Sequence, residues 1–209
     1  MIRNFRPSVL KTIRAGLAVA ALTAIVQQLI LHVAASYSVL NFFSYFTNLS
    51  NLIAASVLLL CVFKRDRGAM DLTRYISVVN MAVVGLVFAV LLRNVDLGAL
   101  LPWVNFVLHY VMPVAIVLDW LVHPPAVKLH TKTLLFACVF PAIYLVYVVV
   151  RGAMIGWYPY PFLNPANVGG YGGVAMYSLG ITVTFLLAAW VLLEVGNRLA
   201  SARSQYAAR

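Results

Sequence analysis

Long apolar stretches dominate the chain, and short polar segments separate them. Six stretches are long enough to cross the hydrocarbon core of a bilayer, which takes about 20 residues of α-helix. They cover residues 15–35, 42–63, 75–92, 103–122, 133–150 and 173–195. Apolar residues follow one another without a period of two, which excludes a transmembrane β-barrel. The pattern predicts an all-α integral membrane protein, with six transmembrane helices in a single bundle.

The composition supports this prediction and narrows the function. Hydrophobic residues make up 64% of the chain and charged residues 10%, whereas a soluble domain carries about 25% charged residues. The net charge of +10 would suit a nucleic-acid partner, but the basic residues lie in short segments between apolar stretches, so we expect none. Cys61 and Cys138 lie within apolar stretches and form no metal or redox motif. We therefore expect no metal site and no cofactor.

Lysine and arginine are distributed unevenly between the two sides of the predicted bundle. Thirteen of the fifteen lie before the first span, between spans two and three, between spans four and five, or after the sixth. Only Arg93 and Arg151 fall on the other side. Because cytoplasmic loops of membrane proteins are enriched in basic residues, we predict that both termini are cytoplasmic.

The longest predicted connection, residues 151–172, lies on the outer side. Its prolines exclude a long regular helix, and its aromatic residues, such as Trp157 and Tyr160, are typical of the lipid–water interface. Two interpretations stay open for this segment. It is either an interfacial anchor or a lid over a pocket in the outer leaflet.

Polar residues inside the predicted spans gather in the outer halves. Such residues are costly in a bilayer and mark either function or contacts between helices. On the second span four of them are spaced i, i+3, i+4 and i+7, which predicts one helix face: Ser44, Thr47, Asn48 and Asn51. On the fourth span Asn105 and His109 also share a face. For Ser44 and Asn51 we favour contacts between helices.

A Thr–His pair is the one hydrolytic chemistry that these residues offer. The sequence lacks Gly-x-Ser-x-Gly and His-Glu-x-x-His motifs. Thr47 and His109 lie at a matched predicted depth, roughly 8–9 Å below the outer edge at 1.5 Å per residue. A threonine hydroxyl needs a base to become a nucleophile, and a histidine can provide one. A third, orienting residue stays open. Asp119 lies roughly 15 Å along the same helix from His109, whereas Asp96 could fold back from the end of the third span. Asn105 or Asn48 could instead orient groups or stabilise an oxyanion.

Other residues near the outer ends are candidates for substrate binding. They are Arg93, Arg151, Tyr144, Tyr147 and Tyr158. For the two arginines we favour the alternative, in which they are interfacial residues that extend toward the head groups.

Three short segments carry a family resemblance. Residues 43–51 read Phe-Ser-Tyr-Phe-Thr-Asn-Leu-Ser-Asn, residues 105–113 read Asn-Phe-Val-Leu-His-Tyr-Val-Met-Pro, and residues 158–162 read Tyr-Pro-Tyr-Pro-Phe. These resemble a family of predicted six-span bacterial membrane proteins that is distantly similar to the androgen-induced and androgen-dependent membrane proteins. Both the androgen-induced and the androgen-dependent proteins are threonine hydrolases that cleave fatty acid esters of hydroxy fatty acids. The resemblance implies catalytic roles for Thr47 and His109, and a location in the bacterial inner membrane.

Two functions are therefore expected. The first is an intramembrane lipid ester hydrolase with Thr47 as the nucleophile and His109 as the base. Asn48, Asn51, Asn105 and Ser44 would form the surrounding polar pocket. The second is a non-enzymatic protein that binds or transports lipid through the same outer-leaflet pocket. In both cases the expected partners are membrane lipids, with a lipid ester as the substrate in the first.

Overall fold

The computed structural model describes residues 7–63, 67–95 and 100–207, and all regular elements in these ranges are helices. Six helical stretches in them are long and apolar enough to cross a membrane, which confirms the predicted all-α, six-span architecture. The stretches are formed by α1 (Pro7–Ala34), α3 (Phe46–Phe63), α4 (Arg67–Val87) with the π-helix η1 (Phe88–Leu92), α5 (Pro102–Phe106) with the π-helix η2 (Val107–Val111) and α6 (Met112–Val122), α7 (Thr133–Ile155), and α8 (Tyr171–Ala207).

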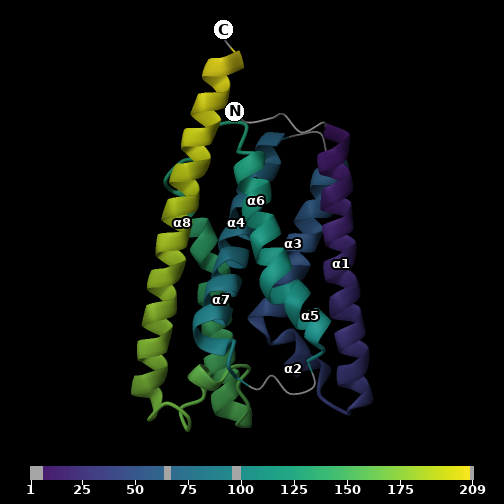
Figure 1. The fold of residues 1–209 in the computed structure, drawn as a ribbon. Helices are drawn as coiled ribbons and strands as arrows, with labels where there is room; N and C mark the ends of the chain where they lie inside the picture. The colour runs from purple at the N-terminus through teal and green to yellow at the C-terminus, as the bar shows by residue number, and fades with distance from the viewer. Residues whose placement is uncertain (1–6, 64–66, 96–99, 208–209) are drawn as a thin grey trace.

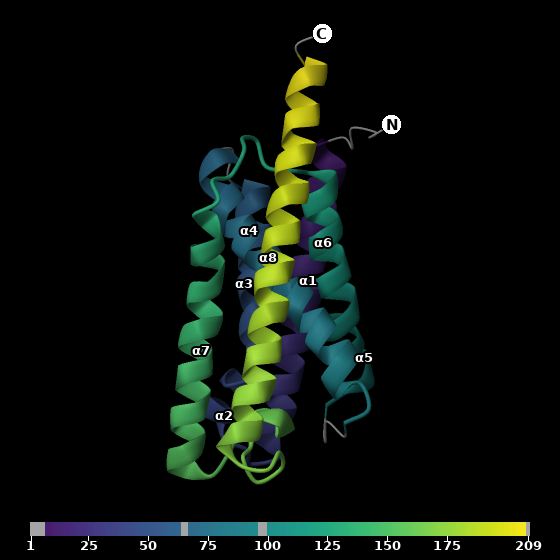
Figure 2. The ribbon, with the colours of Figure 1, turned by 90° about the vertical axis from the view of Figure 1, so that its left-hand side faces the viewer.

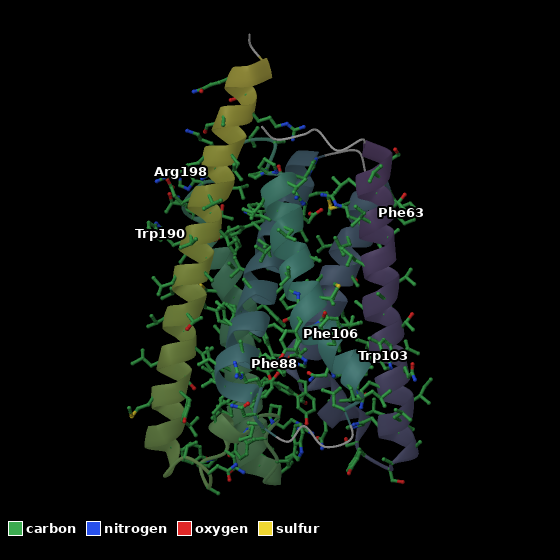
Figure 3. The ribbon with its side chains drawn as sticks, in the orientation of Figure 1. Phe63, Phe88, Trp103, Phe106, Trp190 and Arg198 are labelled. Atoms are coloured by element: carbon green, nitrogen blue, oxygen red, sulfur yellow. The ribbon has the colours of Figure 1, made fainter. Side chains whose placement is uncertain are left out.

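Helix α4 forms the centre of the bundle. It packs against α3, α6, α7 and α8, while α1 packs mainly on α3 (Figures 1 and 2). Of the apolar core of the stretch formed by α4 and η1, 56% is buried within the protein, whereas only 22% is buried in α7. Helix α8 is also peripheral, and its Trp190 and Arg198 project away from the bundle (Figure 3). Helices α7 and α8 therefore present most of their surface to lipid.

The start of α1 and the end of α8 lie at the same end of the bundle (Figure 1). The opposite end carries the connection between α7 and α8, which spans residues 156–170 and is called the outer loop below. A short 3₁₀ helix, η3 (Pro161–Leu163), lies within it. Gly156 ends α7 with a left-handed conformation at φ 71°, which a glycine adopts without steric cost. This turn directs the chain back toward the bundle.

The second apolar stretch differs from the continuous span expected over residues 42–63. The chain forms a short helix α2 (Val39–Phe43), breaks at Ser44 and Tyr45, and starts again as α3 at Phe46. Polar side chains satisfy the carbonyls that the break exposes. The Ser44 hydroxyl donates to the carbonyl of Leu40 at 2.7 Å, and the Asn48 amide donates to the carbonyl of Phe42 at 2.8 Å. Ser44 therefore does not share a helix face with Asn48.

A buried ionic network joins three helices at the end that carries the termini. Arg14 on α1 donates to both carboxylate oxygens of Asp119 on α6, at 2.7 and 3.0 Å. Arg74 on α4 reaches Asp119 at 3.1 Å and Asp71 at 3.2 Å. These four side chains are at most 11% exposed. The two positive and two negative charges compensate one another inside an apolar bundle.

This network predicts a large cost for removing one of its charges. Asp119→Asn leaves two buried guanidinium groups with a single carboxylate, so we expect a loss of about 3–5 kcal/mol in the free energy of unfolding. The measurement is denaturation of the purified protein in mixed detergent micelles. The control is Glu194→Gln, which removes an exposed ion pair with Arg198 and should change stability by under about 1 kcal/mol. Equal effects of the two substitutions would contradict the role assigned to the network.

Candidate functional site

Thr47 occupies the first turn of α3, immediately after the break in the chain. Its hydroxyl-bearing side chain is buried, with 6% exposure. One turn further, the amide of Asn51 donates to the carbonyl of Thr47 at 2.9 Å and to that of Leu108 in η2 at 3.2 Å. This bifurcated contact fixes α3 against η2. Asn51 therefore sets the distance between the two helical stretches that carry Thr47 and His109.

His109 lies in the π-helix η2 and faces the bundle interior. Its ring stacks on Phe88 of the other π-helix, with centroids 4.2 Å apart and planes at 26°. Pro113 follows four residues later and has no N–H to donate to the carbonyl of His109, which interrupts the regular helical pattern there. Single-turn π-helices of this kind are frequent at functional sites.

The structure brings Thr47 and His109 together. Thr47 Oγ1 lies 3.3 Å from His109 Nε2, and His109 Nδ1 lies 3.3 Å from the carbonyl oxygen of Asn105. Because a carbonyl oxygen can only accept, the neutral ring carries its proton on Nδ1. Nε2 is then an acceptor that faces the threonine hydroxyl. This is the arrangement in which an imidazole can remove the hydroxyl proton.

A cavity of about 340 Å³ begins beside Thr47. Helices α4, α7 and α8 and the outer loop enclose it, and most of its lining is apolar, including Val84, Val87, Pro141, Leu145, Ile181 and Phe185. It follows α7 from Val146 to Cys138, roughly 12 Å at 1.5 Å per residue. Val146 lines the cavity and is also 64% exposed on the outside of the bundle. The cavity therefore opens at the apolar outer surface of the bundle beside Val146. Its dimensions and lining suit an aliphatic chain.

Tyr160 of the outer loop also lines this cavity, and sequence reasoning assigned it no role beyond the interface. Its hydroxyl oxygen accepts a hydrogen bond from the backbone N–H of Thr47 at 3.3 Å. Burial raises the pKa of the Tyr160 hydroxyl above its ordinary value. The position of Tyr160 between Pro159 and Pro161 was the one local signal of a fixed backbone there.

Several predicted pocket residues instead hold the break between α2 and α3. Tyr144 donates to the carbonyl of Ser44 at 2.8 Å, and the Tyr147 hydroxyl lies 2.9 Å from the Ser44 hydroxyl. Tyr144 also lines the cavity, whereas Ser44 and Asn48 do not. Asn105 contributes its backbone carbonyl to His109, not its side chain.

The remaining candidates lie away from the cavity. Arg151 donates to the Asn41 side chain at 2.6 Å and packs over the Trp157 ring at 5.2 Å. The Tyr158 hydroxyl is exposed and pairs with that of Tyr171 at 3.3 Å. Arg93 is an exposed residue at the end of η1. Asp119 belongs to the ionic network at the far end, and Asp96 lies outside the described residues.

Asn51 provides a test of this geometry that does not depend on activity. Asn51→Leu preserves side-chain size but leaves the Thr47 and Leu108 carbonyls without their shared donor. We expect a loss of roughly 1–3 kcal/mol in the free energy of unfolding, since buried carbonyls lose a partner. Asn167→Leu is the matched control, because the Asn167 amide is exposed and its contact with Pro161 is long, at 3.5 Å. A stability of Asn51→Leu equal to the control would contradict the bridging role of Asn51.

Comparison with known proteins places the chain in a family. The family model described as FAR-17a/AIG1-like protein matches residues 86–194, just over half of the chain. The matched range includes His109 and Tyr160 and begins after Thr47. No curated protein and no solved structure matches the chain. The extent of the family match shows that the chain belongs to the FAR-17a/AIG1-like family, which is associated with hydrolase activity.

Proposed function

We propose that the protein is a membrane-embedded lipid ester hydrolase in which Thr47 is the nucleophile and His109 the general base. The observation that carries the proposal is the 3.3 Å contact between Thr47 Oγ1 and His109 Nε2. The Asn105 carbonyl holds His109 in the tautomer that can accept the hydroxyl proton. Membership of a family associated with hydrolase activity agrees with this chemistry.

The shape of the cavity supports a lipid ester as the substrate. An acyl chain would lie among apolar side chains along α7 and α8, with its ester carbonyl at Thr47. Fatty acid esters of hydroxy fatty acids, or related lipid esters, have this combination of chains and a central ester. The substrate would enter laterally from the bilayer beside Val146. With both termini cytoplasmic, as the basic residues indicate, the ester would lie near the outer leaflet.

The first half of the reaction transfers the acyl group to the protein. His109 Nε2 takes the proton of the Thr47 hydroxyl while Oγ1 attacks the ester carbonyl and forms a tetrahedral intermediate. The carbon–oxygen bond to the alcohol then breaks. The imidazolium gives its proton to the departing alkoxide oxygen, which leaves as the free alcohol. The acyl group stays on Thr47 as an ester.

The second half returns the protein to its starting state. His109 removes a proton from a water molecule as the water oxygen attacks the acyl carbonyl. The bond between the acyl carbon and Thr47 Oγ1 breaks, and the imidazolium returns its proton to Oγ1. The products are the fatty acid and the original dyad. Among the protein's own groups, only Thr47 and His109 exchange protons in either half.

Removing either partner should abolish turnover without changing the fold. Thr47→Val keeps the side-chain shape and deletes only the hydroxyl, and His109→Ala deletes the base. We expect hydrolysis of short-chain nitrophenyl esters and of a branched fatty acid ester to fall by at least about 10³-fold in both variants. Labelling of Thr47 by a fluorophosphonate, followed by mass spectrometry, should be lost in Thr47→Val.

Two substitutions of the same type serve as controls. Thr184→Val removes a hydroxyl that bonds to its own helix at 2.9 Å and does not line the cavity. His130→Ala removes an exposed histidine at the opposite end of the bundle. Both should hydrolyse esters at the wild-type rate. Full activity in Thr47→Val would refute the proposal, and lipid that co-purifies with an unlabelled, inactive wild type would favour a lipid-binding protein.

A further inference from the structure

The proposed hydrolysis places negative charge on the carbonyl oxygen, and Thr47 and His109 do not stabilise it. In an apolar cavity a developing oxyanion needs a hydrogen-bond donor that is already in place. Building on the proposed function, we propose that the Tyr160 hydroxyl is this donor. The outer loop would then complete the catalytic site from the end of the bundle, and Tyr160 would be a third catalytic residue.

The position of the Tyr160 hydroxyl fits this role. It lies 3.3 Å from the backbone nitrogen of Thr47, and both residues line the same cavity. A carbonyl attacked by Thr47 Oγ1 therefore comes within reach of the tyrosine. Because the phenol oxygen accepts the Thr47 N–H, its own proton is available to a group in the cavity. Accepting that bond also polarises the O–H and strengthens it as a donor.

Other donors near Thr47 are engaged elsewhere. The Tyr144 hydroxyl donates to the carbonyl of Ser44 at 2.8 Å. The Asn51 amide divides its two contacts between the carbonyls of Thr47 and Leu108. The Asn48 amide donates to Phe42 at 2.8 Å. Of the two tyrosines that line the cavity, Tyr144 donates its hydroxyl proton to a backbone carbonyl, whereas no such bond is formed by Tyr160 within the described residues.

The electrostatic surroundings favour the same role. Thr47 lies in the first turn of α3, an 18-residue helix, so the positive end of the helix dipole is directed at the reacting carbonyl. Burial raises the pKa of Tyr160, which keeps the phenol protonated and able to donate over the whole pH range of an ester assay. The helix terminus and the phenol thus act on the same developing charge.

The outer loop holds Tyr160 in a fixed position. Its ring stacks on Phe162 with centroids 5.2 Å apart and planes at 6°, and it meets the Tyr45 ring edge-on at 5.8 Å. Earlier in the loop, the Tyr158 ring packs directly on Gly152 of α7, where a larger side chain would clash with it. These contacts hold the donor in place before the substrate binds, which is what oxyanion stabilisation requires.

Tyr160→Phe removes one oxygen atom and keeps the stacked ring. If the phenol stabilises the oxyanion, kcat should fall by roughly 10²-fold while KM stays within about twofold of the wild type. The matched control is Tyr45→Phe, since the Tyr45 ring lies in the same aromatic cluster and its hydroxyl makes no hydrogen bond within the described residues. Tyr45→Phe should retain the wild-type kcat.

A pair of inhibitors separates catalysis from structural support. A trifluoromethyl ketone forms an oxyanion adduct with Thr47, whereas an ether analogue of the ester has no carbonyl. Tyr160→Phe should bind the ketone roughly 10²-fold more weakly and the ether unchanged. Equal weakening of both, or wild-type kcat in Tyr160→Phe, would refute the role of Tyr160 while Thr47-dependent turnover stands. A wild type without Thr47-dependent turnover would refute the proposed function together with this inference.

Discussion

Backbone groups inside a bilayer have no water to bond with, and this constraint shapes the molecule most at the break between α2 and α3. An interrupted helix exposes carbonyls in apolar surroundings, and each unsatisfied one costs several kcal/mol. The chain provides Ser44, Asn48 and Tyr144 to bond with them or with the turn itself. The polar residues that look like a binding pocket in the sequence are therefore largely what makes the break stable.

The break places Thr47 at the start of a helix, beside the cavity. In an unbroken span Thr47 would sit within a helix, with its N–H bonded to the carbonyl four residues earlier. At the start of α3 its N–H bonds to Tyr160 instead, and the helix terminus is directed at the cavity. On the facing side, η1 and η2 are also irregular, and they bring Phe88 and His109 into stacking contact. Irregular backbone in this bundle thus occurs where it borders the cavity or the site, as expected in membranes.

Much of the fold could be predicted from the sequence because it follows from length and hydropathy. The six spans need only a long apolar stretch each, and the matched depth of Thr47 and His109 follows from the helical rise. The break in the second span was not predicted, because the polar residues around it have the i, i+3, i+4, i+7 spacing of one face of a continuous helix. Tyr160 was also missed, since an aromatic residue in an outer loop looks like an interfacial anchor until the loop is folded onto α3. The position of Tyr160 beside Thr47 depends on a contact between residues 113 positions apart, which no local sequence pattern indicates.

The charged groups of the bundle are kept away from the dyad. Asp119 follows His109 by ten residues on the same span, and it is bound by Arg14 and Arg74 at the opposite end. A backbone carbonyl orients His109 in its place. A carboxylate beside the ring would be a buried charge without a compensating cation, which is costly in apolar surroundings. A carbonyl fixes the same tautomer and leaves the resting site neutral. In the proposed reaction, charge would appear only transiently, as an imidazolium and an oxyanion. The two ions would stabilise each other, and the Tyr160 phenol would share the negative charge.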